Sequence, residues 1–170
     1  VARILASQHT ISPHRMALST VNREGTSFTL IDDSFNANPD SMKAGLNGLK
    51  AWNSNDGKEP FRVALLGAML ELGADETALH TSIGTYAAEL GIDAIIAVGS
   101  AQDQHLDALA QALADGARQP QSASVDCVHD IDAAEQLVID LARNHPDAVV
   151  LLKGSHASGL SALAERWAKN

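Results

Sequence analysis

The sequence predicts an α/β protein, arranged as a three-layer α/β/α Rossmann-like sandwich around a mostly parallel six-stranded sheet. Short apolar runs, typical of strands buried on both faces, alternate with longer segments of helical periodicity. Two strand-like segments joined by a glycine-containing turn come first, so an N-terminal hairpin is expected to supply one antiparallel edge strand. At 170 residues, with 45% hydrophobic and 19% charged residues, the chain fits one globular domain.

The start of the chain is predicted from local patterns. Residues 1–8 have the apolar spacing of a helix but no N-terminal cap, which predicts the last turns of a helix that begins upstream. Beyond them, the expected hairpin consists of a strand at Arg15–Val21, a turn at Asn22–Gly25 and a strand at Ser27–Asp32.

The remaining elements alternate regularly. The predicted strands are Arg62–Gly67, Asp93–Gly99, Ala123–Val128 and Asp147–Lys153. The predicted helices are Pro39–Trp52, a helix capped by Asp75 and ended by Gly91, a helix containing Leu106 and Leu113, a helix capped by Asp130, and a last helix containing Leu160 and Trp167. Gly45 and Gly48 weaken the first of these helices by about 1 kcal/mol each relative to alanine, unless close packing requires them.

Composition and charge exclude several classes of partner. A net charge of −9 argues against nucleic acid and against an anionic membrane surface. Cys127 lies in an apolar run and is predicted to be a small core residue, and a single cysteine suits a reducing compartment. The sequence contains neither a membrane-spanning apolar run nor a signal peptide, so we expect a soluble cytoplasmic domain.

Ligands of open α/β sheets bind beyond the carboxyl ends of the strands, so the residues that follow each strand are the candidates. Polar and glycine-rich signals gather after three predicted strands, in the segments Leu30–Met42, Leu66–Gly73 and Lys153–Gly159. The first segment has five short polar side chains before a helix: Asp32, Asp33, Ser34, Asn36 and Asn38. An ordinary helix cap needs only one such residue, so their density favours a ligand site.

The other two segments leave alternatives open. Lys153 and the serines after it can hold an anion at a helix start, or they are a solvated lysine and a serine cap. Glu71 either binds a partner group or is exposed on a turn. The seven histidines show no metal-ligand spacing, and the chain has no G-x-x-x-x-G-K-[ST] phosphate loop and no G-x-S-x-G nucleophile elbow. From the residues alone, the chain is a ligand-binding α/β module without a self-sufficient catalytic or metal site.

Four motifs resemble the Mur ligases in family order. They are H-R-M at His14–Met16, D-D-S-F-N-A-N-P-D-S-M at Asp32–Met42, L-G-A-M-L-E-L-G at Leu66–Gly73 with His80 downstream, and L-K-G-S at Leu152–Ser155. The second motif resembles the branch that adds D-alanyl-D-alanine to UDP-MurNAc-tripeptide through an acyl phosphate, using ATP and Mg²⁺, in bacterial cytoplasmic peptidoglycan synthesis. The resemblance implies a three-domain enzyme. Residues 1–13 are then the end of the central domain or a linker, and residues 14–170 the C-terminal domain.

The resemblance also implies roles for individual residues. Arg15 and Asp33 are implied to bind the nucleotide, and Ser34, Asn36 and Asn38 to face the incoming substrate and the acyl phosphate. Lys153 and Ser155 are implied to meet the dipeptide carboxylate, and Glu71, His80 and His156 are further candidates. This chain departs from the family pattern at Ala68, where relatives usually have Asp or Glu, at His156, where many have Arg, and at Phe35, where Tyr is commoner.

The implied partners are ATP, UDP-MurNAc-tripeptide, D-alanyl-D-alanine and the enzyme's own central and N-terminal domains, with magnesium held mainly by the central domain. Because this chain lacks the phosphate loop, it is expected to be inactive alone. Two alternatives remain: a stand-alone nucleotide- or anion-binding module, and the equivalent domain of a folylpolyglutamate synthase, against which the N-A-N-P-D-S-M spelling argues.

Overall fold

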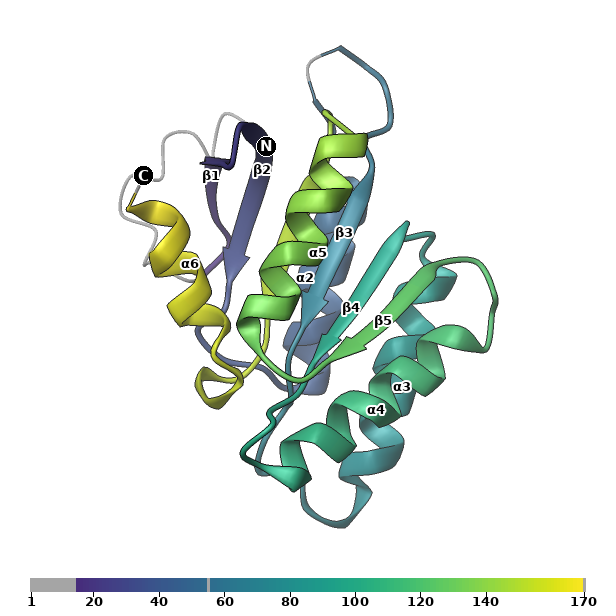
Figure 1. Cartoon of the computed structure of the whole chain (residues 1–170). Helices are drawn as coiled ribbons and strands as arrows, with labels where there is room; N and C mark the ends of the chain where they lie inside the picture. The colour runs from purple at the N-terminus through teal and green to yellow at the C-terminus, as the bar shows by residue number, and fades with distance from the viewer. Residues whose placement is uncertain (1–14, 55, 170) are drawn as a thin grey trace.

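A computed structural model describes residues 15–54 and 56–169, and it confirms the predicted fold class (Figure 1). One six-stranded sheet has the strand order β1-β2-β6-β3-β4-β5. Only β1 is antiparallel to its neighbour, β2, and all the other neighbouring pairs are parallel. The strands are β1 (Ala17–Arg23), β2 (Thr26–Asp33), β3 (Arg62–Leu66), β4 (Ala94–Val98), β5 (Ser124–Val128) and β6 (Val149–Lys153).

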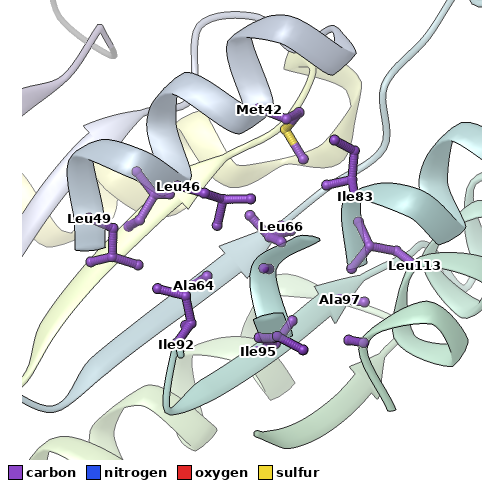
Figure 2. Close-up of a cluster of buried hydrophobic side chains, with 14 of the residues drawn as sticks. Met42, Leu46, Leu49, Ala64, Leu66, Ile83, Ile92, Ile95, Ala97 and Leu113 are labelled. Carbon is purple, nitrogen blue, oxygen red and sulfur yellow. The ribbon is translucent and has the colours of Figure 1, made fainter. Parts of the chain in front are cut away.

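Helices cover both faces of the sheet. They are α2 (Pro39–Ala51), α3 (Glu76–Glu89), α4 (Gln104–Arg118), α5 (Ile131–Asn144) and α6 (Leu160–Ala168). One core lies between the sheet and α2, α3 and α4, with Met42, Leu46, Ile83 and Leu113 among its buried side chains (Figure 2). A second core lies between the opposite sheet face and α5 and α6 (Figure 1). Cys127 packs against the first core as predicted, and burial raises the pKa of its thiol.

The hairpin turn is tighter than the sequence analysis predicted. Asn22 and Arg23 were expected in the turn, but they extend β1, and the turn consists of Glu24 and Gly25 alone. Both turn residues have positive φ, at 48° and 77°. A two-residue turn of this kind matches the right-handed twist of the two strands, which allows pairing up to Arg23 and Thr26. The helix predicted at residues 1–8 lies outside the described residues.

Helix caps agree with the prediction at one of two sites. The Asp130 side chain accepts a hydrogen bond from the Ala133 amide and caps α5, as predicted. Asp75 does precede α3, but its side chain makes no cap bond. A 3₁₀ turn, Gly73–Asp75, runs directly into the helix and gives Asp75 a φ of −91° and a ψ of 10°, which is not the extended backbone that a capping side chain needs.

Strand order brings the three polar segments together. β6 lies between β2 and β3, and in this register Lys153 pairs with Asp33 on one side and with Leu66 on the other. The segments that follow Asp33, Leu66 and Lys153 therefore start at the same edge of the sheet. Within the part of the chain that the structure describes, no helix is both long and apolar enough to cross a membrane.

Candidate functional site

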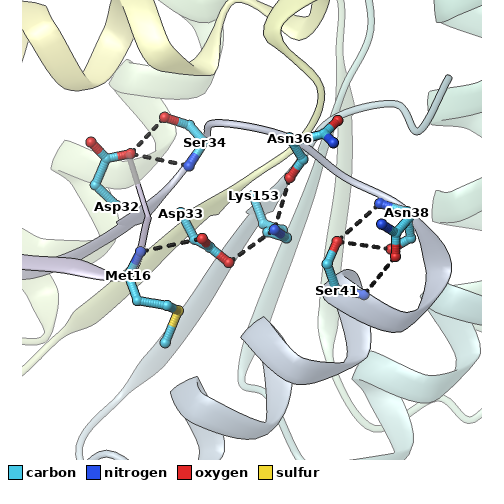
Figure 3. Close-up of polar contacts among 8 residues, drawn as sticks. All are labelled: Met16, Asp32, Asp33, Ser34, Asn36, Asn38, Ser41 and Lys153. Carbon is cyan, nitrogen blue, oxygen red and sulfur yellow. Dashed lines mark hydrogen bonds and ion pairs between the residues drawn. The ribbon is translucent and has the colours of Figure 1, made fainter. Parts of the chain in front are cut away.

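A pocket of about 340 Å³ lies at this carboxyl edge, between the end of β2, the loop after it and the first turns of α2. Its lining includes five residues predicted from the sequence: Arg15, Asp33, Asn36, Asn38 and Lys153. Figure 3 shows the polar contacts of four of these residues, with Asp33 and Lys153 beneath the loop that leads through Asn36 to Asn38. The structure thus brings together residues that are up to 138 positions apart in the chain.

Asp33 and Lys153 form an ion pair at the floor of the pocket. The Lys153 ammonium lies 2.9 Å from Asp33 Oδ2, and the two side chains are 4% and 14% exposed. Asp33 Oδ1 accepts a hydrogen bond from the Met16 amide at 3.2 Å. Burial raises the pKa of Asp33 above its ordinary value, although the hydrogen bond and the charge of Lys153 act in the opposite direction. The carboxylate is therefore held in place from two sides.

The neighbouring Asp32 and Ser34 turn away from this pocket. Asp32 Oδ1 accepts hydrogen bonds from the Ser34 hydroxyl at 2.5 Å and from the Ser34 amide at 3.2 Å. Ser34 is fully buried and does not line the pocket. The bond from the amide two residues on is a local turn of the kind aspartate favours, so this pair shapes the strand end.

Asn38 does two things at the start of α2. Its side-chain oxygen accepts from the Ser41 amide at 2.9 Å, and the Ser41 hydroxyl lies 3.0 Å from the Asn38 amide, which completes a capping box. The side-chain NH₂ of Asn38 is left as a donor at the pocket wall. Asn36 is exposed on the same loop, and its carbonyl accepts from the Lys153 ammonium at 2.8 Å.

Arg15 stacks on Phe35 at the mouth of the pocket. The guanidinium carbon lies 3.9 Å from the ring centroid, and Phe35 is half exposed. Stacking uses the face of the guanidinium and leaves its N–H groups, which point outward in the plane, for an anionic ligand. The absence of the tyrosine hydroxyl at this position does not prevent the stack.

The loop after β3 is fixed by His80. Its Nε2 accepts from the Met69 amide at 2.9 Å, and its Nδ1 lies 2.7 Å from the Glu76 carbonyl, so the ring is neutral with its proton on Nδ1. Burial lowers the pKa of His80, in keeping with that state. With both ring nitrogens bonded inside the fold, His80 belongs to the scaffold of this edge.

Glu71 and Ala68 lie on the same loop. Glu71 is exposed and has a φ of 61°, and it does not line the pocket, so the structure favours the exposed-turn alternative. Ala68 is buried against Leu106 and Leu109. An apolar contact thus occupies the position at which the family pattern has a carboxylate.

The turn after β6 places Ser155 and His156 differently. The Ser155 amide donates to the Ala68 carbonyl at 2.9 Å, and its buried hydroxyl has no hydrogen-bond partner among the described residues. His156 is exposed, and its Nδ1 lies 3.3 Å from the Ser161 hydroxyl. Neither residue lines the pocket, in contrast to Lys153.

Five residues of the pocket lining were not predicted as site residues from the sequence: Met16, Phe35, Ser41, Ala44 and Gly45. A Cβ added at Gly45 would lie 3.3 Å from Asp33 Oδ2 and 3.5 Å from Lys153 Cδ. A glycine inside a helix costs about 1 kcal/mol relative to alanine. That cost was the available signal of a close contact at Gly45, but the sequence did not indicate which residues it contacts.

The described residues include no group of three or more His, Cys, Asp or Glu side chains placed to hold a metal ion. What the edge offers is an arginine at the mouth, a paired carboxylate on the floor and amide groups along the wall. These features define an α/β domain whose pocket carries charged and amide groups suited to a phosphate-bearing or hydroxyl-bearing ligand.

Comparison with known families identifies the domain. The family model described as "Mur ligase, glutamate ligase domain" matches residues 14–156, and the chain belongs to this family. The chain is 37% identical over 171 residues to the UDP-N-acetylmuramoyl-tripeptide–D-alanyl-D-alanine ligase of Mycobacterium tuberculosis, a match that covers 97% of this chain and 33% of that protein. The ligase of the same name from Mycobacterium leprae is 37% identical over 174 residues, with 97% and 32% covered. The chain spans about a third of the length of these relatives.

Solved structures agree with this assignment. A crystal structure of MurF from Acinetobacter baumannii superposes with a TM-score of 0.69 at 25% identity, covering 94% of this chain and 31% of that one. MurF from Thermotoga maritima, solved in complex with ADP, superposes with a TM-score of 0.64 at 21% identity, covering 93% and 31%. At that lower identity the second match supports the fold alone.

Proposed function

We propose that this chain is the C-terminal domain of an ATP-dependent ligase that joins D-alanyl-D-alanine to UDP-MurNAc-tripeptide. The observation that carries the proposal is the pocket in which the D-D-S-F-N-A-N-P loop meets Arg15 and Lys153. The relatives that share 37% identity over 97% of the chain are named for this reaction. We also propose that residues 14–170 form this domain and that residues 1–13 belong to the preceding domain or linker.

The reaction has two chemical steps. The terminal carboxylate of the tripeptide attacks the γ-phosphorus of ATP, and ADP leaves, which gives an acyl phosphate. The amine of D-alanyl-D-alanine then attacks the acyl carbon, the C–O bond to phosphate breaks, and the nitrogen loses a proton as the amide forms. An acyl phosphate is prone to hydrolysis, so a domain that closes over it, excludes water and orients the amine favours ligation.

The roles we propose follow from the geometry of the pocket. Arg15, stacked on Phe35, presents outward N–H donors that suit a phosphate of the nucleotide. The Asp33 carboxylate is an acceptor for ribose hydroxyl groups. Asn36 and the NH₂ of Asn38 line the wall where the second substrate and the acyl phosphate would lie.

We propose that the other domains of the enzyme hold magnesium, because no residue in the described part of this chain acts as a metal ligand in the proposed mechanism. When bound there, magnesium would supply charge neutralisation at the transferred phosphoryl group. The proposed partners are ATP, UDP-MurNAc-tripeptide, D-alanyl-D-alanine and the preceding domains. Because the substrates are ATP and a nucleotide-linked precursor, we propose that the enzyme acts in the cytoplasm.

The competing functions are a stand-alone binding module and the equivalent domain of a folylpolyglutamate synthase. The names of the relatives reported above favour the dipeptide ligase over both. The sequence upstream of residue 1 separates the first alternative from the proposal. A G-[TS]-x-G-K-[TS] phosphate loop encoded there supports the ligase, and a start codon immediately before residue 1 supports the module.

Kinetics of the full-length enzyme test the proposal. Release of phosphate is measured with ATP, UDP-MurNAc-tripeptide and D-alanyl-D-alanine for Arg15→Ala, Asp33→Ala and Asn36→Ala. Each variant is expected to lose about 10-fold or more in kcat/KM, since each removes a polar group that binds a reactant. The control is Arg143→Ala, an exposed arginine in the last turn of α5, outside the pocket. Wild-type kinetics in all three variants contradict the site, and absence of dipeptide-dependent phosphate release in the wild type contradicts the function.

A further inference from the structure

We propose that Lys153 is a positioning residue, which holds Asp33 and the loop of residues 34–38 in their binding geometry and does not itself bind the dipeptide. This inference rests on the proposed function and deepens it, because it divides the pocket into groups that touch reactants and one group that orders them. It also replaces the role that the family resemblance implied for Lys153.

The contacts of Lys153 are already made within the fold. Its side chain is 4% exposed, and its ammonium lies 2.9 Å from Asp33 Oδ2 and 2.8 Å from the Asn36 carbonyl oxygen. An ammonium has three N–H donors, so two of the three are used by the protein. A carboxylate ligand would have to compete with a carboxylate that is already in contact with the ammonium.

The two acceptors belong to different parts of the site, as Figure 3 shows. Asp33 is the last residue of β2, while Asn36 lies in the loop between β2 and α2. Lys153 pairs with Asp33 in the sheet, and its side chain extends past the strand end to the loop backbone. One cation therefore fixes both the direction of the Asp33 carboxylate and the path of the loop that carries Asn36 and Asn38.

Gly45 of α2 closes this arrangement from the helix side. A Cβ there would lie 3.3 Å from Asp33 Oδ2, which is tighter than most contacts of a Cβ atom. It would also lie 3.5 Å from Lys153 Cδ, an ordinary van der Waals distance. The helix thus packs directly on the ion pair. Substitution by alanine pushes on the pair without changing any charge, which separates geometry from electrostatics in a test.

The surroundings of Asp33 show what Lys153 does to its charge. Asp32 on β2 raises the pKa of Asp33 and Lys153 on β6 lowers it, while burial raises it more than either. Arg15 is the other charged residue of the pocket lining, and α2 contributes the uncharged Ser41, Ala44 and Gly45. Removing the lysine therefore raises the pKa of Asp33 further and lowers its ionised fraction at a given pH.

The test uses the full-length enzyme and the variants Lys153→Met, Lys153→Arg and Gly45→Ala. For Lys153→Met we expect the KM for ATP to rise about 10-fold or more, with the KM for D-alanyl-D-alanine within about 2-fold of wild type. The acidic limb of kcat/KM for ATP moves to higher pH, because the ionised Asp33 accepts the ribose hydroxyls more strongly than the protonated form does. Lys153→Arg restores part of the loss, and the control Lys43→Met, an exposed lysine of α2, behaves as wild type.

Each outcome decides a different question. A KM for the dipeptide that rises about 10-fold while the KM for ATP is unchanged overturns the inference and makes Lys153 a dipeptide ligand. If Lys153→Met does not fold, Gly45→Ala decides: a higher KM for ATP alone supports the inference, and unchanged kinetics overturn it. Failure of the wild-type enzyme to ligate the dipeptide contradicts the proposed function instead, so the two failures are distinguishable.

Discussion

Replacing Gly84 by alanine tests how closely α3 and α4 cross. A Cβ at Gly84 would lie 1.9 Å from the carbonyl oxygen of Leu113 and 2.8 Å from the amide nitrogen of Ala117, which are backbone atoms of α4. On the other helix, a Cβ at Gly116 would lie 2.0 Å from the carbonyl oxygen of Thr81. Backbone atoms cannot rotate out of the way as a side chain does, so the added methyl group must push the helices apart.

The size of the effect follows from opposing contributions. Alanine improves helix propensity by about 1 kcal/mol over glycine. Forcing the helices apart costs about 1–3 kcal/mol in overpacking strain, and more where the obstacle is backbone. Separation also weakens the hydrogen bond from the Thr85 hydroxyl to the Gly116 carbonyl, 2.9 Å long, which is worth about 1 kcal/mol. We therefore expect Gly84→Ala to lower the free energy of unfolding by about 1–3 kcal/mol.

The assay is urea unfolding of this 170-residue chain, followed by circular dichroism. The matched control is Gly48→Ala, also inside a helix, where the new Cβ meets only the end of the flexible Met16 side chain. There we expect the free energy of unfolding to be unchanged or to rise by up to about 1 kcal/mol. A Gly84→Ala variant as stable as wild type would refute the close backbone crossing.

Three further predictions concern polar groups that hold the fold. Burial lowers the folded-state pKa of His80 below its ordinary value of 6.5. The unfolded state therefore binds the proton first, and the free energy of unfolding falls as pH drops below 6.5, by up to about 1.4 kcal/mol per pH unit. Unfolding measured from pH 8 to 5 should show this slope in the wild type and a smaller one in His80→Gln; equal slopes contradict it. Asn38→Ala removes the cap of α2 and should lower the free energy of unfolding in urea by about 1 kcal/mol. Asn38→Asp keeps the cap and should keep most of the stability. Equal losses in the two variants would argue against capping. Glu135→Ala deprives the Trp167 indole N–H of its acceptor at 2.7 Å. It should lower the free energy of unfolding by about 2 kcal/mol in a thermal unfolding experiment, and Glu135→Gln should lower it less. No loss of stability in either variant would count against a structural role of Glu135.

The elements of this protein could be predicted from local patterns in its sequence. Apolar runs of strand length and helical periodicity gave the α/β class, and polar residues after three strands indicated the binding edge. The hairpin turn was predicted to begin two residues too early, because the extent of a turn depends on cross-strand pairing rather than on composition. Asp75 was predicted as a capping side chain, but a 3₁₀ turn that the local residues did not indicate leads into α3.

The segment Asp32–Asn38 illustrates the same division within the site. Five polar side chains in Asp32–Asn38 marked a site, yet only the structure separates those that line the pocket from Ser34, which is buried on Asp32. His80 likewise has both ring nitrogens bonded to backbone groups. The hydrogen-bond partner of a polar group depends on the burial and packing of segments that are distant in the sequence. Local sequence patterns do not predict that packing.

The sequence by itself determined that the chain has alternating strands and helices, with clusters of polar residues at the carboxyl ends of its strands. It did so because side-chain periodicity reports local structure directly. The tertiary structure decided the strand order that puts β6 between β2 and β3, and with it the contact of Lys153 with Asp33 and with the Asn36 carbonyl. Pairing between strands far apart in the sequence is a property of the whole packed core. The sequence therefore marked Lys153 as a candidate ligand, and only the fold shows that its ammonium is already bonded within the protein.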